Sequence, residues 1–234
     1  MGLLFLVGYA GSGKSSLGRR LARRMRCRFV DTDNLVEQQE GATIADIFYY
    51  EGEEYFRIEE RRAVEALANE GMTGKYGLRV GYCINHLENK EVFGGDFLSY
   101  AMALTAAASD TRMAGCTLPA MSNSGSGNQG ITVTMPVIAY SKFYNTDDER
   151  LARALTLSHL IAIHIKGYLG KLSALCGCVI ASTGSACGLV YLRGGDYVQV
   201  CSAIKNMIGN ITGMVCDGAK VGCAMKVASG VSSA

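Results

Sequence analysis

The sequence is poor in several residue types that would mark particular classes of protein. Its 234 residues include no tryptophan, two prolines and three histidines, and its formal net charge is +2. A charge this close to neutral gives no case for binding nucleic acid or an anionic membrane, and two prolines exclude a proline-rich linker. Because 49% of the residues are hydrophobic, the chain can build a core. We therefore expect a globular protein that binds small molecules, with assembly into a homo-oligomer left open.

Signals for export or membrane insertion are also missing. The apolar stretch 1–7 lacks the positively charged start of a signal peptide, and nine cysteines then favour the reducing cytoplasm, where thiols pack, bind metals or act as nucleophiles. Residues 172–192 carry no charge and are long enough to span a bilayer, but serine, threonine and glycine interrupt the run. Small residues of this kind indicate closely packed helices in a protein core.

The first 25 residues match a phosphate-binding pattern. An apolar run at 3–7 predicts a buried parallel strand, and it leads into Gly8-Tyr-Ala-Gly-Ser-Gly-Lys14-Ser15. Leu17, Leu21 and Met25 then give the next segment a helical apolar face. In such a P-loop, backbone N–H groups surround phosphate oxygens, while the lysine and serine serve the outer phosphates and magnesium. The residues expected to bind ATP are Gly8, Gly11, Ser12, Gly13, Lys14, Ser15 and Ser16.

Two carboxylates follow at Asp31-Thr-Asp33, after an apolar pair at 29–30 that predicts a second strand. In an extended chain both point the same way, so one could help to hold magnesium and the other a polyol. A polar turn between a strand and a helix explains them equally well.

With the P-loop and Gly52-Glu-Glu-Tyr-Phe-Arg57, this segment resembles the N-terminal part of shikimate kinase over residues 1–73. The resemblance implies that Ser15 and Asp31 serve the magnesium ion of ATP and that Asp33 and Arg57 bind shikimate. Catalysis would then be phosphoryl transfer by positioning and charge stabilisation. That family also has an arginine in its lid and a later arginine that binds substrate, and neither has a counterpart here.

The composition changes after about residue 75, where eight of the nine cysteines and 20 of the 29 glycines follow. This change predicts a separate module over residues 74–234. Small residues at 97–108 have a helical pattern, and Asp147-Asp-Glu-Arg150 is typical of a helix start, with its acids at the positive end of the dipole. The predicted fold is therefore an α/β P-loop fragment followed by a mainly α-helical domain.

A polar, glycine-rich loop covers residues 118–130 of this module. It contains Gly125-x-Gly127-x-x-Gly130, but Leu118-Pro119 before it and Ile131-Thr-Val-Thr-Met-Pro136 after it are not expected to form the strand and helix that a dinucleotide fingerprint requires. The loop could instead grip a substrate carboxylate with backbone N–H groups and polar side chains, or it could be an ordinary loop. The side chains in question are those of Ser122, Asn123, Ser124 and Asn128.

Two further groups could carry chemistry. His159, in the predicted helix after residue 147, is a candidate general base or else a satisfied core residue. Cys216 and Cys223 lie seven positions apart, and Cys176 lies forty residues upstream. Three thiolates can hold an iron-sulfur cluster and leave one iron for substrate, whereas free cysteines are also among the most buried residues.

Residues 74–234 resemble the C-terminal part of the L-cysteine desulfidase family, which is itself similar to the α chain of iron-sulfur L-serine dehydratase. The resemblance implies a [4Fe-4S] cluster held by Cys176, Cys216 and Cys223, whose open iron acts as a Lewis acid while L-cysteine or L-serine is converted to pyruvate and ammonia. The family's Gly-Cys-Thr-Glu-Pro element, with its catalytic cysteine, has no counterpart. The segments that carry the resemblance are Gly74-Lys-Tyr-Gly-Leu78, Ser109-Asp-Thr-Arg-Met-Ala-Gly115, 118–131, 147–155 and 213–220.

The whole chain is thus predicted to be a hybrid of a kinase-like segment and a lyase-like domain. Both parts lack elements of their families. The alternatives to a lyase are a shikimate kinase and a fusion product without function.

Overall fold

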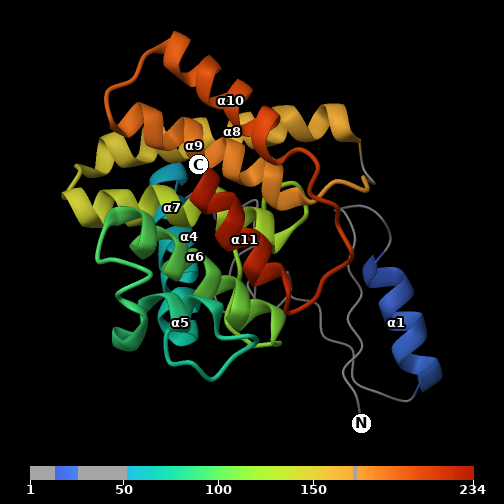
Figure 1. The fold of residues 1–234 in the computed structure, drawn as a ribbon. Helices are drawn as coiled ribbons and strands as arrows, with labels where there is room; N and C mark the ends of the chain where they lie inside the picture. The colour runs from blue at the N-terminus through green and yellow to red at the C-terminus, as the bar shows by residue number, and fades with distance from the viewer. Residues whose placement is uncertain (1–13, 26–51, 171–172) are drawn as a thin grey trace. The chain divides into compact units, whose positions relative to one another are not determined.

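The computed structural model describes residues 14–25, 52–170 and 173–234. The chain divides into two compact units, residues 1–59 and residues 60–234, and each is considered by itself (Figure 1). The predicted strands at 3–7 and 29–30 lie outside the described residues.

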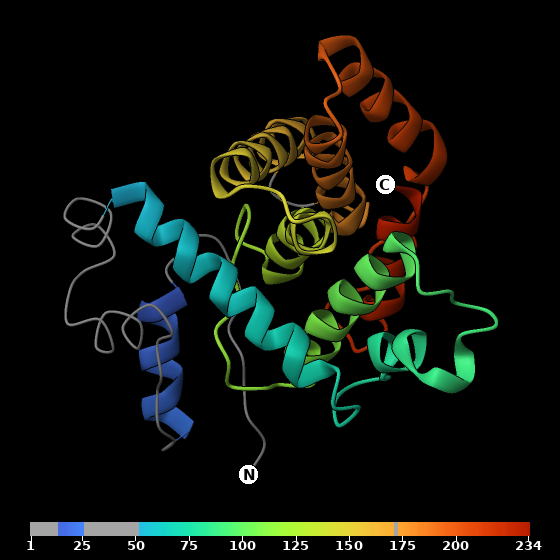
Figure 2. The ribbon, with the colours of Figure 1, turned by 90° about the vertical axis from the view of Figure 1, so that its left-hand side faces the viewer.

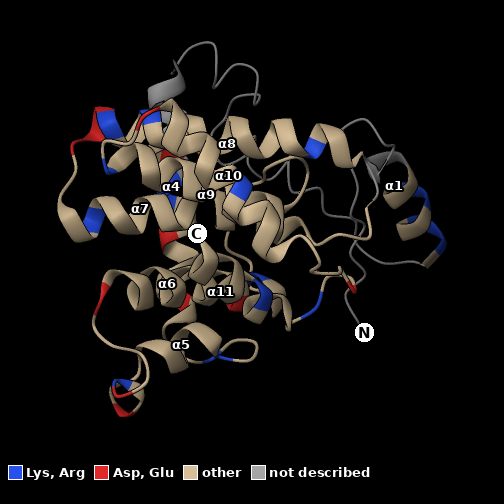
Figure 3. Cartoon of the chain, turned by 45° about the horizontal axis from the view of Figure 1, so that its top comes forward, with Lys and Arg blue, Asp and Glu red and all other residues tan. Residues whose placement is uncertain are grey.

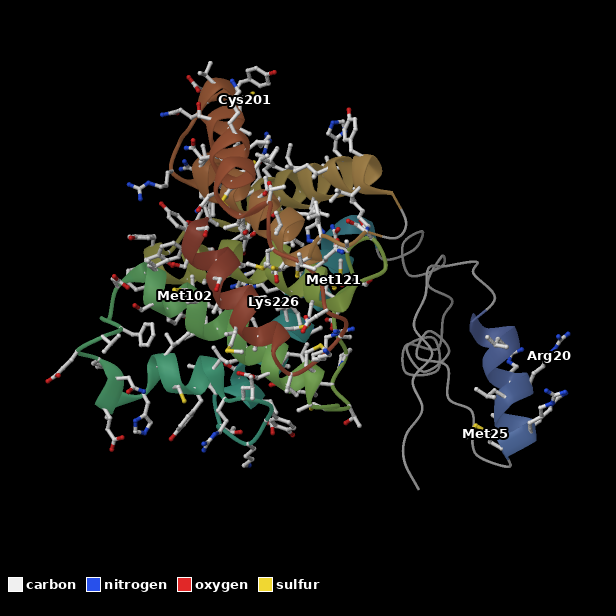
Figure 4. All side chains as sticks on the ribbon, turned by 45° about the vertical axis from the view of Figure 1, so that its right-hand side comes forward. Arg20, Met25, Met102, Met121, Cys201 and Lys226 are labelled. Atoms are coloured by element: carbon white, nitrogen blue, oxygen red, sulfur yellow. The ribbon has the colours of Figure 1, made fainter. Side chains whose placement is uncertain are left out.

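In the first unit, helix α1 (Lys14–Met25) confirms the helix predicted after the P-loop pattern. Its predicted apolar face is not its buried face, because Ala22 is buried while Leu17 and Met25 are 57% and 53% exposed. Figure 4 shows Met25 and Arg20 on this helix.

The predicted α/β fold class is wrong. Among the residues that the structure describes, the regular elements are helices, and the β-structure consists of two isolated bridges without a strand or sheet. A parallel strand is stable only beside neighbouring strands, and the described part of the chain supplies none. The α/β fragment was inferred from the short P-loop pattern alone, and the described part of the chain is mainly α-helical instead.

Helices make up the second unit. Helix α4 begins before its boundary, and its residues from 60 onward belong to it. Figures 1 and 2 show α10 at the edge of this helical assembly. The elements are α4 (Gly52–Gly71), α5 (Val80–Asn85), the short 3-10 helix η2 (Leu87–Asn89), α6 (Phe97–Met113), α7 (Gly127–Tyr144), α8 (Asp148–Leu169), α9 (Gly177–Leu192), α10 (Tyr197–Ile211) and α11 (Cys223–Ser233).

Side-chain caps fix where these helices begin. Asp147 accepts a hydrogen bond from the Arg150 backbone N–H at 2.8 Å, which confirms the helix start predicted there. Asp96 caps α6 in the same way, and Asp196 forms a reciprocal capping box at α10. Such caps satisfy backbone donors that have no partner inside the helix.

Helix α9 forms the centre of the unit and packs against α7, α8, α10 and α11. Its small residues allow this, since a Cβ added at Gly184 would lie 2.4 Å from the Ser158 carbonyl oxygen of α8. Residues 177–192 of the uncharged run therefore form a closely packed helix, as predicted. None of the helices in the described residues has the length and apolar character that crossing a membrane requires.

A buried carboxylate organises the turn before α5. Asp110 of α6 is 0% exposed and accepts hydrogen bonds from the backbone N–H groups of Leu78, at 3.1 Å, and Gly81, at 3.2 Å. Burial raises its pKa, although these N–H groups act in the opposite direction. Positions of lysine and arginine and positions of aspartate and glutamate are both scattered over the helices and loops (Figure 3).

Candidate metal and amino-acid site

Three segments carry the cysteines that were predicted as cluster ligands. Cys176 is the N-cap residue of α9, Cys216 lies in the loop between α10 and α11, and Cys223 is the first residue of α11. Cys176 is buried, Cys216 is exposed and Cys223 is intermediate. Two of the three thiols therefore lie at the positive ends of helix dipoles.

A β-bridge between Leu175 and Val215 joins two of these segments. The Cys176 N–H donates to the Met214 carbonyl at 2.8 Å, and the Cys216 N–H donates to the Ala174 carbonyl at 2.7 Å. Side chains alternate along extended chains, so this pairing puts Cys176 and Cys216 on the same face of the bridge. The bridge brings together two thiols that are forty residues apart in sequence.

Lys226 of α11 fixes the loop that contains Cys216. Its ammonium group donates to the Val215 carbonyl at 3.0 Å and forms an ion pair with Asp217. This pairing lowers the pKa of Asp217, and Lys220 adds a weaker contact at 3.5 Å. Figure 4 shows Lys226 on α11.

The surroundings of Cys176 favour its thiolate. A hydrogen bond from the Cys178 thiol, opposed by burial and supported by the Cys178 backbone N–H and the charge of Lys226, lowers the pKa of Cys176 to about 6. The same hydrogen bond and burial raise the pKa of Cys178. Burial raises the pKa of Cys187 to about 12, so this thiol stays protonated at neutral pH. Of these three cysteines, Cys176 is the one prepared to act as a ligand.

The described residues contain no group of three or more histidine, cysteine, aspartate or glutamate side chains already gathered around a single metal position. An iron-sulfur cluster is held by thiolates, and three thiols lie on neighbouring segments beside a cationic lysine and two helix N-termini. The residues fit such a cluster in donor type and in electrostatic surroundings. Their assignment as its ligands stays a prediction.

The loop predicted at 118–130 ends at Ser126, because residues 127–130 form the first turn of α7, and Asn128 therefore lies on that helix. Asn123 is buried, and its carbonyl oxygen accepts a hydrogen bond from the Ser124 hydroxyl at 3.1 Å, whereas Ser122 is exposed. Asn128 accepts a hydrogen bond from Arg112 at 3.2 Å. Ser124 has a positive φ of 50°, a conformation that is uncommon outside glycine. Carboxylate binding by these four side chains stays a prediction.

His159 lies next to this loop and is only 6% exposed. Its Nδ1 is 3.1 Å from the Asn123 amide nitrogen, and its Nε2 is 3.0 Å from the Thr134 hydroxyl. An amide nitrogen only donates, so Nδ1 accepts and Nε2 carries the proton, which describes a neutral imidazole. His159 is placed to fix the loop, and its role as a base stays a prediction.

Two residues that sequence reasoning missed lie beside the cysteines. The Arg112 guanidinium packs against Gly127, where an added Cβ would be 2.2 Å from Nε, and the charge of Cys223 acts on it. The Gln129 side chain covers Gly177, where an added Cβ would be 2.5 Å from Nε2. Arg112 falls within a segment that carried the family resemblance, and that was its one sequence signal.

The remaining predicted site residues are those of the kinase-like segment. Lys14, Ser15 and Ser16 belong to α1 and Arg57 to α4, but their side chains are outside the described part of the structure. The P-loop glycines and Ser12, together with Asp31 and Asp33, are likewise outside it.

Fold and site together define a mainly helical protein with a thiol-rich candidate metal site at the N-termini of two helices. The family pattern of the serine dehydratase alpha chain matches residues 34–234, and the chain belongs to this family. The match starts inside residues 1–73, and neither the comparisons nor the described structure supports a kinase segment there.

Several curated proteins are similar to the chain. It is 56% identical over 178 residues to a UPF0597 protein of Oleidesulfovibrio alaskensis and 52% identical over 180 residues to one of Phocaeicola vulgatus; each match covers 76% of this chain and 42% of the relative. A UPF0597 protein of Fusobacterium nucleatum is 48% identical over 169 residues, which are 72% of this chain and 40% of that protein. The chain thus spans about two fifths of the length of these relatives. No solved structure matches it.

Proposed function

We propose that the chain supplies the cluster-binding part of an iron-sulfur amino-acid lyase, which converts L-serine or L-cysteine to pyruvate and ammonia with release of water or sulfide. Membership of the serine dehydratase alpha chain family supports the reaction class. The observation that supports the proposal is the bridge between Leu175 and Val215, which joins the segments that carry Cys176 and Cys216. Because the relatives are much longer, the complete reaction is proposed for a full-length protein of this kind.

In this proposal, Cys176, Cys216 and Cys223 would hold a [4Fe-4S] cluster, which when bound supplies a Lewis acid that polarises the substrate hydroxyl or thiol. The chain prepares the ligands in advance. A pKa of about 6 leaves Cys176 mainly as thiolate at neutral pH. Lys226 holds the Cys216 loop in place through the Val215 carbonyl and Asp217.

Removal of the substrate α proton requires a base. In its neutral form His159 accepts from Asn123 and donates to Thr134, so it could take up a proton at Nδ1 only after the Asn123 amide turned or moved. We therefore give His159 a positioning role in this state, in which it orders the loop that would face the substrate. A role as the base would require that rearrangement.

Anaerobic reconstitution with iron and sulfide tests the cluster. The wild-type chain should gain a broad visible absorption band and about four irons, and Cys216→Ala should lose the band. Cys83→Ala is the matched control, because Cys83 is also exposed but lies on α5. A chain that stays colourless and free of iron would refute the proposal, as would equal cluster content in all three proteins.

A further inference from the structure

Arg112 carries a cation that the described residues leave without a carboxylate. Its Nη1 donates to the Asn128 side chain and touches the Met113 sulfur, both at 3.2 Å. A guanidinium has five N–H donors in a planar fork, so most of its capacity is free for another acceptor. The cation also lies against the first residue of α7, where the helix dipole is positive. This arrangement favours a bound anion.

Gln129, in the first turn of α7, needs a hydrogen-bond donor, whereas Arg112 has N–H groups to donate. Among the residues that the structure describes, the Gln129 side-chain oxygen Oε1 has no hydrogen-bond partner, and the residue is only 6% exposed. A buried acceptor without a donor costs free energy, and native proteins retain few of them. The side chain extends across Gly177, which follows Cys176. A ligand with an N–H group would satisfy Oε1.

The two groups lie near two of the three cysteines, Cys223 and Cys176. Arg112 is close enough to Cys223 for their charges to interact, and Gln129 covers the first residue after Cys176. Within the described part of the chain, the N-terminus of α7 thus has beside it a guanidinium with unused N–H groups, from Arg112 of α6, and an unsatisfied acceptor of its own, Gln129 Oε1. An α-amino acid carries the matching groups, a carboxylate and an ammonium, on a single carbon.

We propose that Arg112 binds the α-carboxylate of the substrate by paired hydrogen bonds and that Gln129 Oε1 accepts one from its α-ammonium group. This assignment rests on the proposed function, because it supposes an amino-acid substrate. In this arrangement the β hydroxyl or thiol would point toward the cysteines. Arg112 and Gln129 would recognise the α-carboxylate and the α-ammonium group, which serine and cysteine share. Arg112 is suited to this role because its planar fork matches a carboxylate.

Binding of three small ligands tests the assignment. L-Alanine has both α groups and no leaving group, propionate lacks the amino group and ethylamine lacks the carboxylate. Calorimetric titration of the chain, before and after iron loading, should rank L-alanine above propionate and propionate above ethylamine.

Substitutions then separate the two contacts. Arg112→Gln should weaken binding of both L-alanine and propionate by roughly tenfold or more, since a charged hydrogen-bonded pair is lost. Gln129→Met, of similar shape, should reduce L-alanine to the affinity of propionate. It should leave the midpoint of thermal unfolding unchanged or higher, because it removes an unsatisfied oxygen. Arg193→Gln is the control, since Arg193 is exposed and follows the other end of α9.

Three results would overturn the assignment. The wild-type chain could bind none of the ligands, with or without iron; Arg112→Gln could bind L-alanine as the control does; or Gln129→Met could keep the preference for L-alanine. Loss of the cluster band in Arg112→Gln with L-alanine binding intact would instead make Arg112 a partner of the thiolates. Arginine-dependent binding in a chain that takes up no iron would support the recognition site and refute the lyase proposal. An iron-loaded chain that ignores L-alanine would do the reverse.

Discussion

The helical core around α9 and the cysteine loop at residues 212–222 are held by different means. In the core, residues of α9 are buried on all sides, and glycines bring helix backbones into direct contact. In the loop, Cys216 and Asp217 are exposed, and two backbone hydrogen bonds with one lysine maintain the arrangement. The comparison indicates that the core determines stability, whereas the loop can change its chemistry with little effect on folding.

The two regions meet at Cys176. This residue caps the helix that forms the core, and its backbone also pairs with the loop. A rigid helix therefore fixes the position of one thiol, and the loop brings a second thiol to it. A site built in this way has a fixed side and an adjustable side, and substitutions on the two sides should differ in the size and type of their effects.

The largest loss of stability is expected where helix backbones touch. In Gly184→Val, the new Cβ would lie 2.4 Å from the Ser158 carbonyl, so α8 and α9 must separate. Overpacking of this kind should reduce the free energy of unfolding by roughly 3 kcal/mol, measured by urea denaturation. Gly209→Val on α10 is the control, because a Cβ there meets nothing within 4 Å. Equal losses in both variants would contradict the view that close packing around α9 dominates.

A smaller loss is expected at the buried carboxylate of α6. Asp110→Asn replaces one of two accepting oxygens by a donor that faces a backbone N–H, which should cost about 1–2 kcal/mol at pH 7. Because the folded pKa is raised, the contribution of Asp110 is greatest below the ordinary aspartate value and declines as pH rises through the folded pKa.

Urea denaturation at acidic and neutral pH checks this sign. The difference between wild type and Asp110→Asn should be wider at the acidic pH. Glu91→Gln serves as control, because Glu91 is exposed and should change stability by less than about 0.5 kcal/mol at either pH. A gap that narrows on acidification would mean that the folded state favours the ionised form.

Parts of the fold follow from local sequence signals. The acids at 147–150 predicted the start of α8, and the small residues at 97–108 predicted most of α6. Helix α7 escaped prediction, because β-branched residues and Pro136 have poor helix propensity, yet the helix forms through burial against α6, α8 and α9. The α/β prediction failed for a related reason, since a strand depends on neighbours that a local motif does not reveal.

The candidate site divides in the same way. Cysteine spacing and the family resemblance predicted the three thiols as ligands, but the bridge that joins the segments of Cys176 and Cys216 spans forty residues and leaves no local pattern. Arg112 and Gln129 are ordinary residues in sequence. They were found from the structure, because among the described residues the Arg112 cation faces no carboxylate and Gln129 Oε1 has no hydrogen-bond donor.

The smallest effect on stability, with a clear effect on the site, is expected for Lys226→Met. The variant loses the contacts to Asp217 and the Val215 carbonyl, which lie at the exposed surface, so the midpoint of thermal unfolding should hardly change. The pKa of Asp217, followed by NMR titration, should rise toward the ordinary value, because its lowering depends first on Lys226. The ion pair holds above the ordinary aspartate pKa and is lost as pH falls through the lowered value.

A loop without this anchor should release iron to a chelator several times faster than wild type does. Lys205→Met is the control, because Lys205 is exposed on α10 and forms no ion pair with the other described residues. If both variants lost iron at the wild-type rate while the Asp217 pKa rose as expected, the bridge alone would hold Cys216 in place. The adjustable side of the site would then be as firmly fixed as the side built on α9.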